Sequence, residues 1–194
     1  MRTLIWEDAL PILTSIQFME NSVLKPNDKE EVGEFIIPKC TSLKLIQWKG
    51  EPIKGPLNKK TIVEYQGEPF YAELVVLRMY RSNGWDGRWI QSFGKPQYLM
   101  DMFPHGQNVP LPDAKEGIIK KISAGIGKDW SGCWDLFLWN DINETRFIEL
   151  KRRKVDALKP NQIKWLRSAL ENGISLSDFL IVEWDFLIEN YNKP

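Results

Sequence analysis

The C-terminal half of the chain carries a succession of apolar segments that few folds accommodate. Two of them, CWDLFLWN and ETRFIELK, are separated by the tripeptide DIN at 141–143, which predicts a β-hairpin. The next segment, PNQIKWLRSALENG, has apolar residues at helical spacing, with Pro160 suited to the first turn and Gly173 to the end. A final apolar segment, DFLIVEWDF, predicts a strand. A strand, a helix and a strand in this order require a right-handed crossover and a parallel strand pair. The pattern therefore predicts an α/β (α+β) fold with a mixed β-sheet flanked by helices.

Upstream of the hairpin, helical patterns alternate with loops. The segment 67–85 has helical spacing of apolar residues, and Gly84 is placed to end that helix. We predict a short helix in KPQYLMDMF (95–103) and a longer one in AKEGIIKKISAGIG (114–127).

Residues 1–66 are predicted to form an N-terminal α/β extension, with the core following at 67–194. A partly helical pattern at 6–21 is interrupted by a proline, EFIIPK (34–39) and LKLIQWKG (43–50) predict short strands, and KGEPIKGPLNKK (49–60) predicts a loop. No chemistry is assigned to this extension.

Composition narrows the classes of function. The chain of 194 residues has 26 basic and 26 acidic residues, so any nucleic-acid site must be a local basic patch on a neutral background. No apolar run approaches the roughly 18 residues that a membrane span needs, and Glu7 and Asp8 interrupt the apolar region that a signal peptide would have. The two cysteines lie far apart, which is neither a zinc pattern nor a disulfide framework. A cytoplasmic protein that contacts no membrane is expected.

The hairpin brings two carboxylates together if its loop consists of DIN alone. Asn140 then pairs with Glu144, and Asp135 falls opposite Glu149 on the same face. Lys151, two residues further on, shares the face of Glu149. A one-residue change of register would move Asp135 to the other face, so this interpretation depends on the loop length.

Two carboxylates so close to each other repel unless a cation lies between them. Asp135, Glu149 and the carbonyl oxygen of Leu150 are hard oxygen ligands of the kind that Mg²⁺ or Mn²⁺ binds, with positions left for water and phosphate. Lys151 would orient the attacking water or stabilise charge on phosphate. Taken alone, a Glu-x-Lys sequence also fits a strand end that runs into solvent.

An aspartate followed by Glu-x-Lys across a hairpin resembles the PD-(D/E)xK nuclease superfamily, which has the restriction-endonuclease-like fold. The segment after the hairpin is similar to the VRR-NUC branch: Glu149 and Lys151 are followed by Gln162 at a helix start, a Trp-Leu pair at 165–166 and Gly173. WSGCWDLFLWN resembles the segment of that branch that contains its aspartate, although Trp134 replaces the proline before it. The resemblance covers about residues 68–186.

The resemblance implies a Mg²⁺-dependent deoxyribonuclease, a hydrolase that cuts phosphodiester bonds in structured, branched or flapped DNA during DNA repair. It also implies a homodimer, the state in which many stand-alone relatives act. The family often adds a glutamate from its N-terminal helical region. Glu73 is the candidate here, with Glu68 and Glu64 as rivals.

Two groups of residues near the predicted site keep alternative interpretations. Gln162 could cap the helix start or hold Lys151 or a phosphate. The basic residues near the site could form a solvated face or a contact patch for the DNA backbone; they are Arg152, Arg153, Lys154, Lys159, Lys164 and Arg167. Two alternative functions are a catalytically inactive nucleic-acid-binding or interaction module with the same fold, and a restriction-type endonuclease with sequence recognition in residues 1–66.

Overall fold

The structure is a computed structural model that describes residues 24–51, 53, 60–92, 96–102, 107–128 and 130–187. The predicted helix at 6–21 lies outside the described residues, as does most of the predicted loop at 49–60. Among the described residues, no helix is both long enough and apolar enough to cross a membrane.

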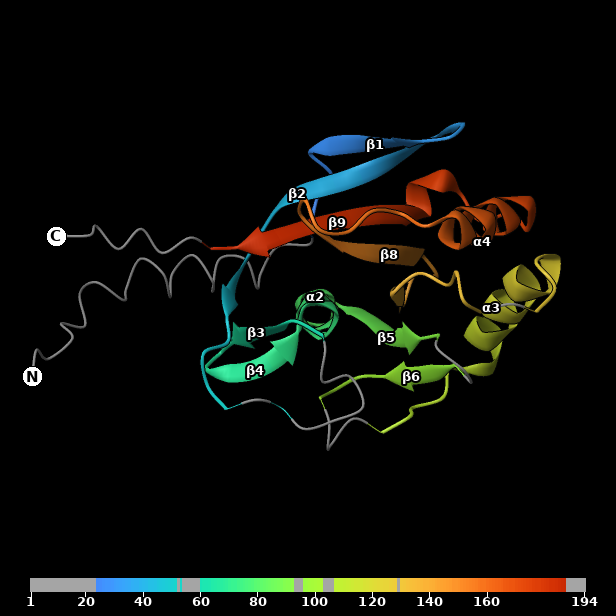
Figure 1. The fold of residues 1–194 in the computed structure, drawn as a ribbon. Helices are drawn as coiled ribbons and strands as arrows, with labels where there is room; N and C mark the ends of the chain where they lie inside the picture. The colour runs from blue at the N-terminus through green and yellow to red at the C-terminus, as the bar shows by residue number, and fades with distance from the viewer. Residues whose placement is uncertain are drawn as a thin grey trace, which may run out of the picture.

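The described chain folds into one sheet with helices on both faces (Figure 1). The helices are α2 (Ala72–Arg81), α3 (Asp113–Gly125) and α4 (Pro160–Glu171), with a short 3-10 helix, η2 (Leu176–Asp178). The strands are β1 (Asp28–Val32), β2 (Phe35–Gln47), β3 (Ile62–Tyr65), β4 (Glu68–Tyr71), β5 (Trp85–Gln91), β6 (Gln97–Leu99), β7 (Leu136–Asn140), β8 (Thr145–Arg152) and β9 (Phe179–Phe186).

The sheet has nine strands and is mixed, as the sequence predicts. Its order is β4-β3-β2-β9-β8-β7-β5-β6, and β1 pairs with β2 at the side. β9 runs parallel to both β8 and β2, and the other pairs are antiparallel. The predicted parallel pair of β8 and β9, joined through α4, is therefore confirmed.

The β7–β8 hairpin has the register that the sequence predicts. Leu136 pairs with Ile148, and the backbone N–H of Asn140 donates to the carbonyl of Glu144 at 3.2 Å. The loop is DIN, and Asn143 takes a left-handed conformation (φ 64°), which asparagine tolerates better than most residues. Continued outward by one residue, this register sets Asp135 opposite Glu149.

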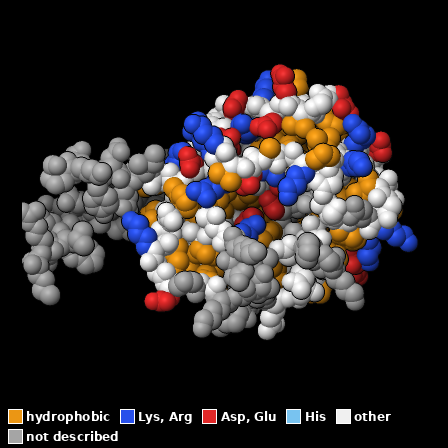
Figure 2. Space-filling model, in the orientation of Figure 1, with side chains coloured by type: hydrophobic (Ala, Val, Ile, Leu, Met, Phe, Trp, Pro, Cys, Tyr) orange, Lys and Arg blue, Asp and Glu red, His pale blue; other side chains and the backbone are white. Residues whose placement is uncertain are grey.

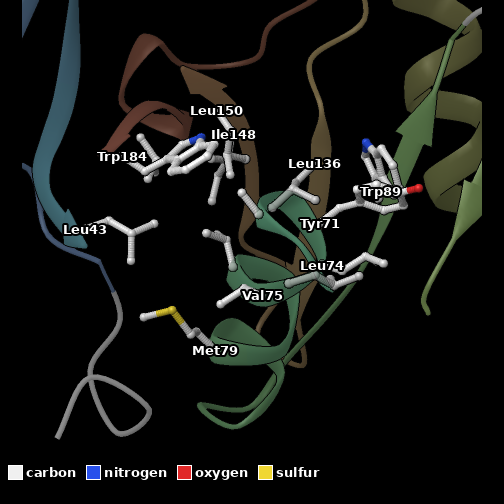
Figure 3. Packing of buried hydrophobic residues seen from close by; sticks show 14 of the residues in the cluster. Leu43, Tyr71, Leu74, Val75, Met79, Trp89, Leu136, Ile148, Leu150 and Trp184 are labelled. Carbon is white, nitrogen blue, oxygen red and sulfur yellow. The ribbon is translucent and has the colours of Figure 1, made fainter. Parts of the chain in front are cut away.

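Alternate residues of the central strands divide the core into two clusters. Leu136, Ile148 and Leu150 pack with α2 on one face (Figure 3). Phe137 and Phe147 point to the opposite face, where α3 and α4 cover them. The strict alternation of apolar side chains therefore places α2 and α4 on opposite sides of the same hairpin.

Two predictions differ from the structure, and both differences arise from long-range pairing. The predicted short strands at 34–39 and 43–50 are parts of one strand, β2, which lies between β1 and β9 over its first part. The predicted helix at 95–103 contains a strand instead, because Tyr98 and Leu99 pair with β5 and are buried against it.

β1, β2 and β3 precede residue 67 yet belong to the same sheet as the later strands. The domain boundary at residues 66/67 thus stays a prediction and does not coincide with a break in the sheet.

An aromatic stack holds the three central strands together on the α4 face. The rings of Phe137 and Phe147 lie 4.7 Å apart, those of Phe147 and Phe179 lie 5.1 Å apart, and all three are fully buried. Phe147 is the middle ring, so its loss would leave a cavity with two unsupported neighbours.

We expect Phe147→Ala to lower the free energy of unfolding by about 3–5 kcal/mol, the usual range for a truncated core phenylalanine. Urea denaturation followed by circular dichroism measures this loss. Ile142→Ala, in the exposed hairpin loop, is the control and should change stability by less than about 0.5 kcal/mol. Equal effects of the two substitutions would contradict the role given to the stack.

Candidate active site

A cavity of about 570 Å³ opens where the β7–β8 hairpin meets α2 and the start of α4. Figure 2 shows basic and acidic side chains lying together near the middle of the face it draws. The described residues that line the cavity include all four predicted catalytic residues, Asp135, Glu149, Lys151 and Gln162. The structure therefore brings together residues that lie up to 27 positions apart in the sequence.

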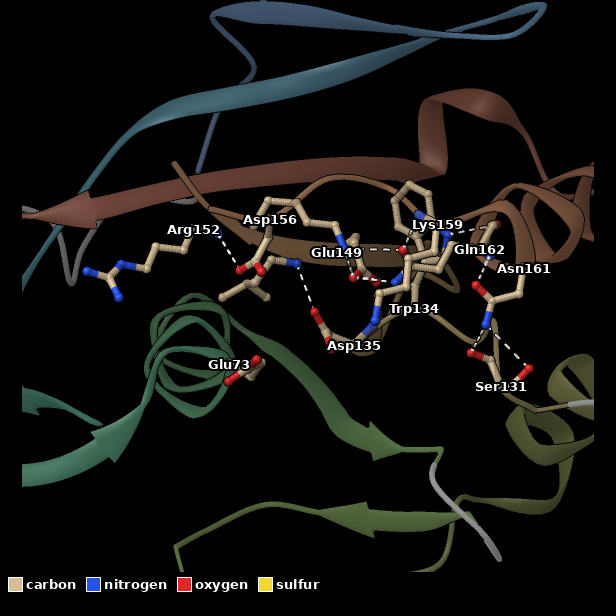
Figure 4. Close-up of polar contacts among 12 residues, drawn as sticks. Glu73, Ser131, Trp134, Asp135, Glu149, Arg152, Asp156, Lys159, Asn161 and Gln162 are labelled. Carbon is tan, nitrogen blue, oxygen red and sulfur yellow. Dashed lines mark hydrogen bonds and ion pairs between the residues drawn. The ribbon is translucent and has the colours of Figure 1, made fainter. Parts of the chain in front are cut away.

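Asp135 lies immediately before β7, where the strand pairing with β8 stops. Its Oδ2 accepts a hydrogen bond from the backbone N–H of Leu150 at 2.9 Å, and its own backbone N–H donates to Glu149 Oε2 at 3.2 Å. The aspartate thus satisfies a strand N–H that has no further β7 residue to pair with. Figure 4 shows the carboxylates of Asp135 and Glu149 at the same end of the hairpin.

Glu149, Lys151 and Gln162 form a closed network on the α4 face of β8. The Lys151 ammonium lies 2.8 Å from Glu149 Oε1 and 3.2 Å from Gln162 Oε1, and the Gln162 amide nitrogen donates to Glu149 Oε1. All three side chains are buried. Each charged group in this network has a partner of opposite charge or a hydrogen bond, as buried charges require.

Both interpretations of Gln162 hold at once. Its Oε1 accepts from the backbone N–H of Lys159 at 2.9 Å, which caps the first turn of α4. The same oxygen accepts from Lys151. The start of α4 and the position of the Lys151 ammonium are therefore coupled through one amide.

The turn before Asp135 is packed against the start of α4. Asn161 donates from its side chain to the carbonyl of Ser131, and a Cβ atom added to Gly132 would lie 2.1 Å from the carbonyl oxygen of Asn161. Glycine is needed at position 132 because the two backbones approach too closely for any side chain.

Glu73 enters the cavity from α2, on the other side of Asp135 from Glu149 (Figure 4). Its side chain is buried, and among the described residues Oε2 has no hydrogen-bond partner. Its rivals Glu64 and Glu68 lie in β3 and β4, and neither is among the described residues that line the cavity. The geometry favours Glu73 as the additional carboxylate, which remains a prediction as a ligand.

Sequence reasoning missed Lys60, which also lines the cavity. Its ammonium lies 2.6 Å from Glu73 Oε1 and 5.1 Å from the centre of the Trp89 ring. The only sequence signal was a lysine pair at the end of a loop rich in proline and glycine, which marks no site by itself.

The environment of the cavity disfavours charged carboxylates. Burial and the neighbouring Glu149 raise the pKa of Asp135 to about 7. Burial likewise raises the pKa of Glu149 and of Glu73, although Lys151 and Lys60 respectively oppose this shift. Burial lowers the pKa of Lys60, but Glu73, Asp135 and Glu149 outweigh it and raise that pKa overall. Raised carboxylate pKa values in a cleft are typical of functional sites.

The donor set fits a hard divalent cation in its chemistry. Three carboxylates and the backbone of Leu150 surround one cavity, and one buried carboxylate oxygen has no partner in the described part of the chain. In the arrangement that the structure describes, however, these residues do not form a group of three acidic, histidine or cysteine side chains close enough to hold an ion.

Two of the six predicted basic contact residues line the described cavity, and their role in DNA contact remains a prediction. Arg152 and Lys159 line the cavity. Arg153 pairs with Glu183 at 3.5 Å and Arg167 pairs with Glu34 at 2.6 Å. Lys154 and Lys164 are exposed. The geometry favours Arg152 and Lys159 among the six for contact with a ligand in the cavity.

The mixed sheet with helices on both its faces is consistent with a restriction-endonuclease-like fold. Residues 88–177 match the family model of the VRR-NUC domain, a range narrower than the resemblance at 68–186. This part of the chain is therefore similar to the VRR-NUC domain, a nuclease domain family of the restriction-endonuclease-like superfamily. Neither the curated proteins nor the solved structures include a significant match to the chain.

The raised pKa of Asp135 predicts a pH-dependent stability in the absence of metal. The folded state keeps a proton between about pH 4 and 7 that the unfolded state has lost, so this group's contribution to folding falls as pH rises through that window. Asp135→Asn removes the contribution. In EDTA, the melting temperature of the variant minus that of the wild type should rise from pH 5 to pH 8. A difference that does not change with pH would contradict this expectation.

We expect Gly132→Ala to push the start of α4, with Gln162, away from the hairpin. The forced contact should lower stability by about 1–3 kcal/mol and should weaken the Lys151 network. Thermal unfolding measures the loss, and Gly117→Ala in α3, where an added Cβ meets nothing within 4 Å, is the matched control. The prediction is wrong if both variants melt like the wild type.

Proposed function

We propose that the chain is a metal-dependent DNA endonuclease that hydrolyses phosphodiester bonds with water as the nucleophile. The observation that carries the proposal is the contact network of Asp135, Glu149, Lys151 and Gln162 around one cavity. All four lie within the range that matches the VRR-NUC domain. Structural ion pairs elsewhere in the molecule, such as Lys39 with Glu30, do not line this cavity.

Asp135, Glu149 and the carbonyl of Leu150 would hold Mg²⁺ or Mn²⁺, with Glu73 as the fourth candidate ligand. When bound, the ion supplies an activated water and neutralises charge that develops on the phosphate. Gln162 and Glu149 hold the Lys151 ammonium at the cavity. From there it can orient water or stabilise negative charge on a non-bridging phosphate oxygen.

Arg152 and Lys159 would contact the DNA backbone at the mouth of the cavity. The Arg152 guanidinium lies 4.6 Å from the Phe186 ring centre and 5.8 Å from that of Trp184, which limits its conformations. An arginine held in this way suits a fixed contact with phosphate better than one that is fully exposed.

The finer parts of the proposal rest on the family resemblance. They are a preference for branched or flapped DNA, a role in DNA repair, action as a homodimer and a cytoplasmic location.

We expect Lys151→Ala to lower the rate of DNA cleavage at least about 10²–10³-fold, because it removes a charge aimed at the reacting phosphate. The assay incubates plasmid and branched DNA with Mg²⁺, with Mn²⁺ and with EDTA, and EDTA should abolish cleavage by the wild type. Lys120→Ala is the control, since Lys120 is exposed on α3 and pairs with Glu116. Unchanged cleavage by a folded Lys151→Ala variant would refute the mechanism.

A catalytically inactive binding module is the second candidate. The observation that favours it is the spacing of the carboxylates, which do not form a ready metal group in the described residues. Binding of DNA without cleavage under every metal condition would support this candidate. A restriction-type enzyme, the third alternative, would cut at one sequence in a map of cleavage sites.

A further inference from the structure

The Lys60 ammonium lies among the carboxylates of the cavity. It is 2.6 Å from Glu73 Oε1, and the charges of Asp135 and Glu149 also act on it. Lys60 lines the same cavity as all three. Lys60 is thus a second cation of the site. It differs from Lys151, which pairs with Glu149 on the α4 face of the sheet.

A cation at this place offsets the cost of burying carboxylates close to one another. Glu73 is buried in the first turn of α2, and the partly buried Asp135 is close enough to repel it. Carboxylates removed from water are costly unless they are paired or protonated. Lys60 supplies the positive charge, and the Trp89 ring face beneath it adds a cation–π contact.

The same carboxylates are the candidate ligands of a divalent ion. The Lys60 ammonium and a divalent ion cannot both occupy the space between them. An ammonium and a divalent ion within a few ångströms of each other repel strongly in a partly buried site. The Lys60 ammonium can move from Glu73 into solvent, because about a third of the side chain (34%) is exposed and the side chain has four rotatable bonds.

We propose that Lys60 is the resident counter-cation of the metal-free site and that a divalent ion binds in competition with it. Metal binding displaces the Lys60 ammonium from Glu73 toward solvent and lets the carboxylates close on the ion. This inference rests on the proposed metal-dependent function. It adds a residue outside the range 88–177 that sets the metal affinity.

The first test measures Mn²⁺ binding by isothermal titration calorimetry without DNA. Lys60→Met keeps an unbranched side chain of similar length and removes its charge, so it should bind Mn²⁺ about tenfold more tightly than the wild type. Lys60→Arg keeps the charge and should bind Mn²⁺ at least as weakly as the wild type. Lys44→Met is the matched control, because Lys44 pairs with Asp185 outside the cavity, and it should bind like the wild type. Equal or weaker binding by Lys60→Met overturns the inference.

Lys60→Met should also be less stable than the wild type in EDTA, and Mn²⁺ should raise its melting temperature by more. If that variant does not fold, the wild type alone still tests the proposal. Brief acetylation followed by mass spectrometry should show Lys60 reacting several-fold faster in Mn²⁺ than in EDTA, with Lys120 as the internal reference. An unchanged Lys60 rate overturns the inference.

The failure of this inference is distinguishable from the failure of the proposed function. If the wild type neither binds Mn²⁺ nor cleaves DNA, the proposed function fails and the inference fails with it. If the wild type and Lys60→Met both bind Mn²⁺ with one affinity and cleave DNA, only the role of Lys60 is refuted.

Discussion

The register of the β7–β8 hairpin is the constraint on which the fold and the site both depend. Pairing of Leu136 with Ile148 sends both side chains to the α2 face, and Phe137 and Phe147 go to the α4 face. The same register carries Glu149 toward Gln162 and sets Asp135 opposite it. A shift of the β7–β8 register by one residue would bury charged side chains in both core clusters. The apolar packing of the two clusters therefore fixes the geometry of the site.

The site uses parts that also serve the fold. Asp135 caps a strand N–H, Gln162 caps α4, and Gly132 allows the turn between them to approach the helix. Because each residue has a structural role, the side chains are positioned by the backbone elements rather than by flexible loops. In the proposed nuclease, this arrangement would reduce the conformational freedom that catalysis has to restrict.

Much of this half of the molecule follows from local sequence patterns. The DIN loop determines the hairpin register, and Pro160 and Gly173 mark α4 correctly to within two residues. The errors occur where the partner lies far away in the sequence. β2 continues through Pro38 because β1 lies along one side of it, and residues 97–99 form a strand because β5 is available. Lys60 could not be identified from its neighbours in sequence, since its significance comes from Glu73 and Asp135, which reach it only in the folded chain.

Charged side chains reach the site from both faces of the sheet. The two faces differ in how many partners each charged side chain has. On the α4 side, Glu149, Lys151 and Gln162 hold one another, so altering one member leaves another buried group without its partner. On the α2 side, Glu73 and Lys60 form a single pair with one end open to solvent. They also precede the residues that match the family domain. If the cavity binds a cation as proposed, substitutions on the α2 side would change how strongly it does so, while the Glu-x-Lys network on the other side would keep its geometry.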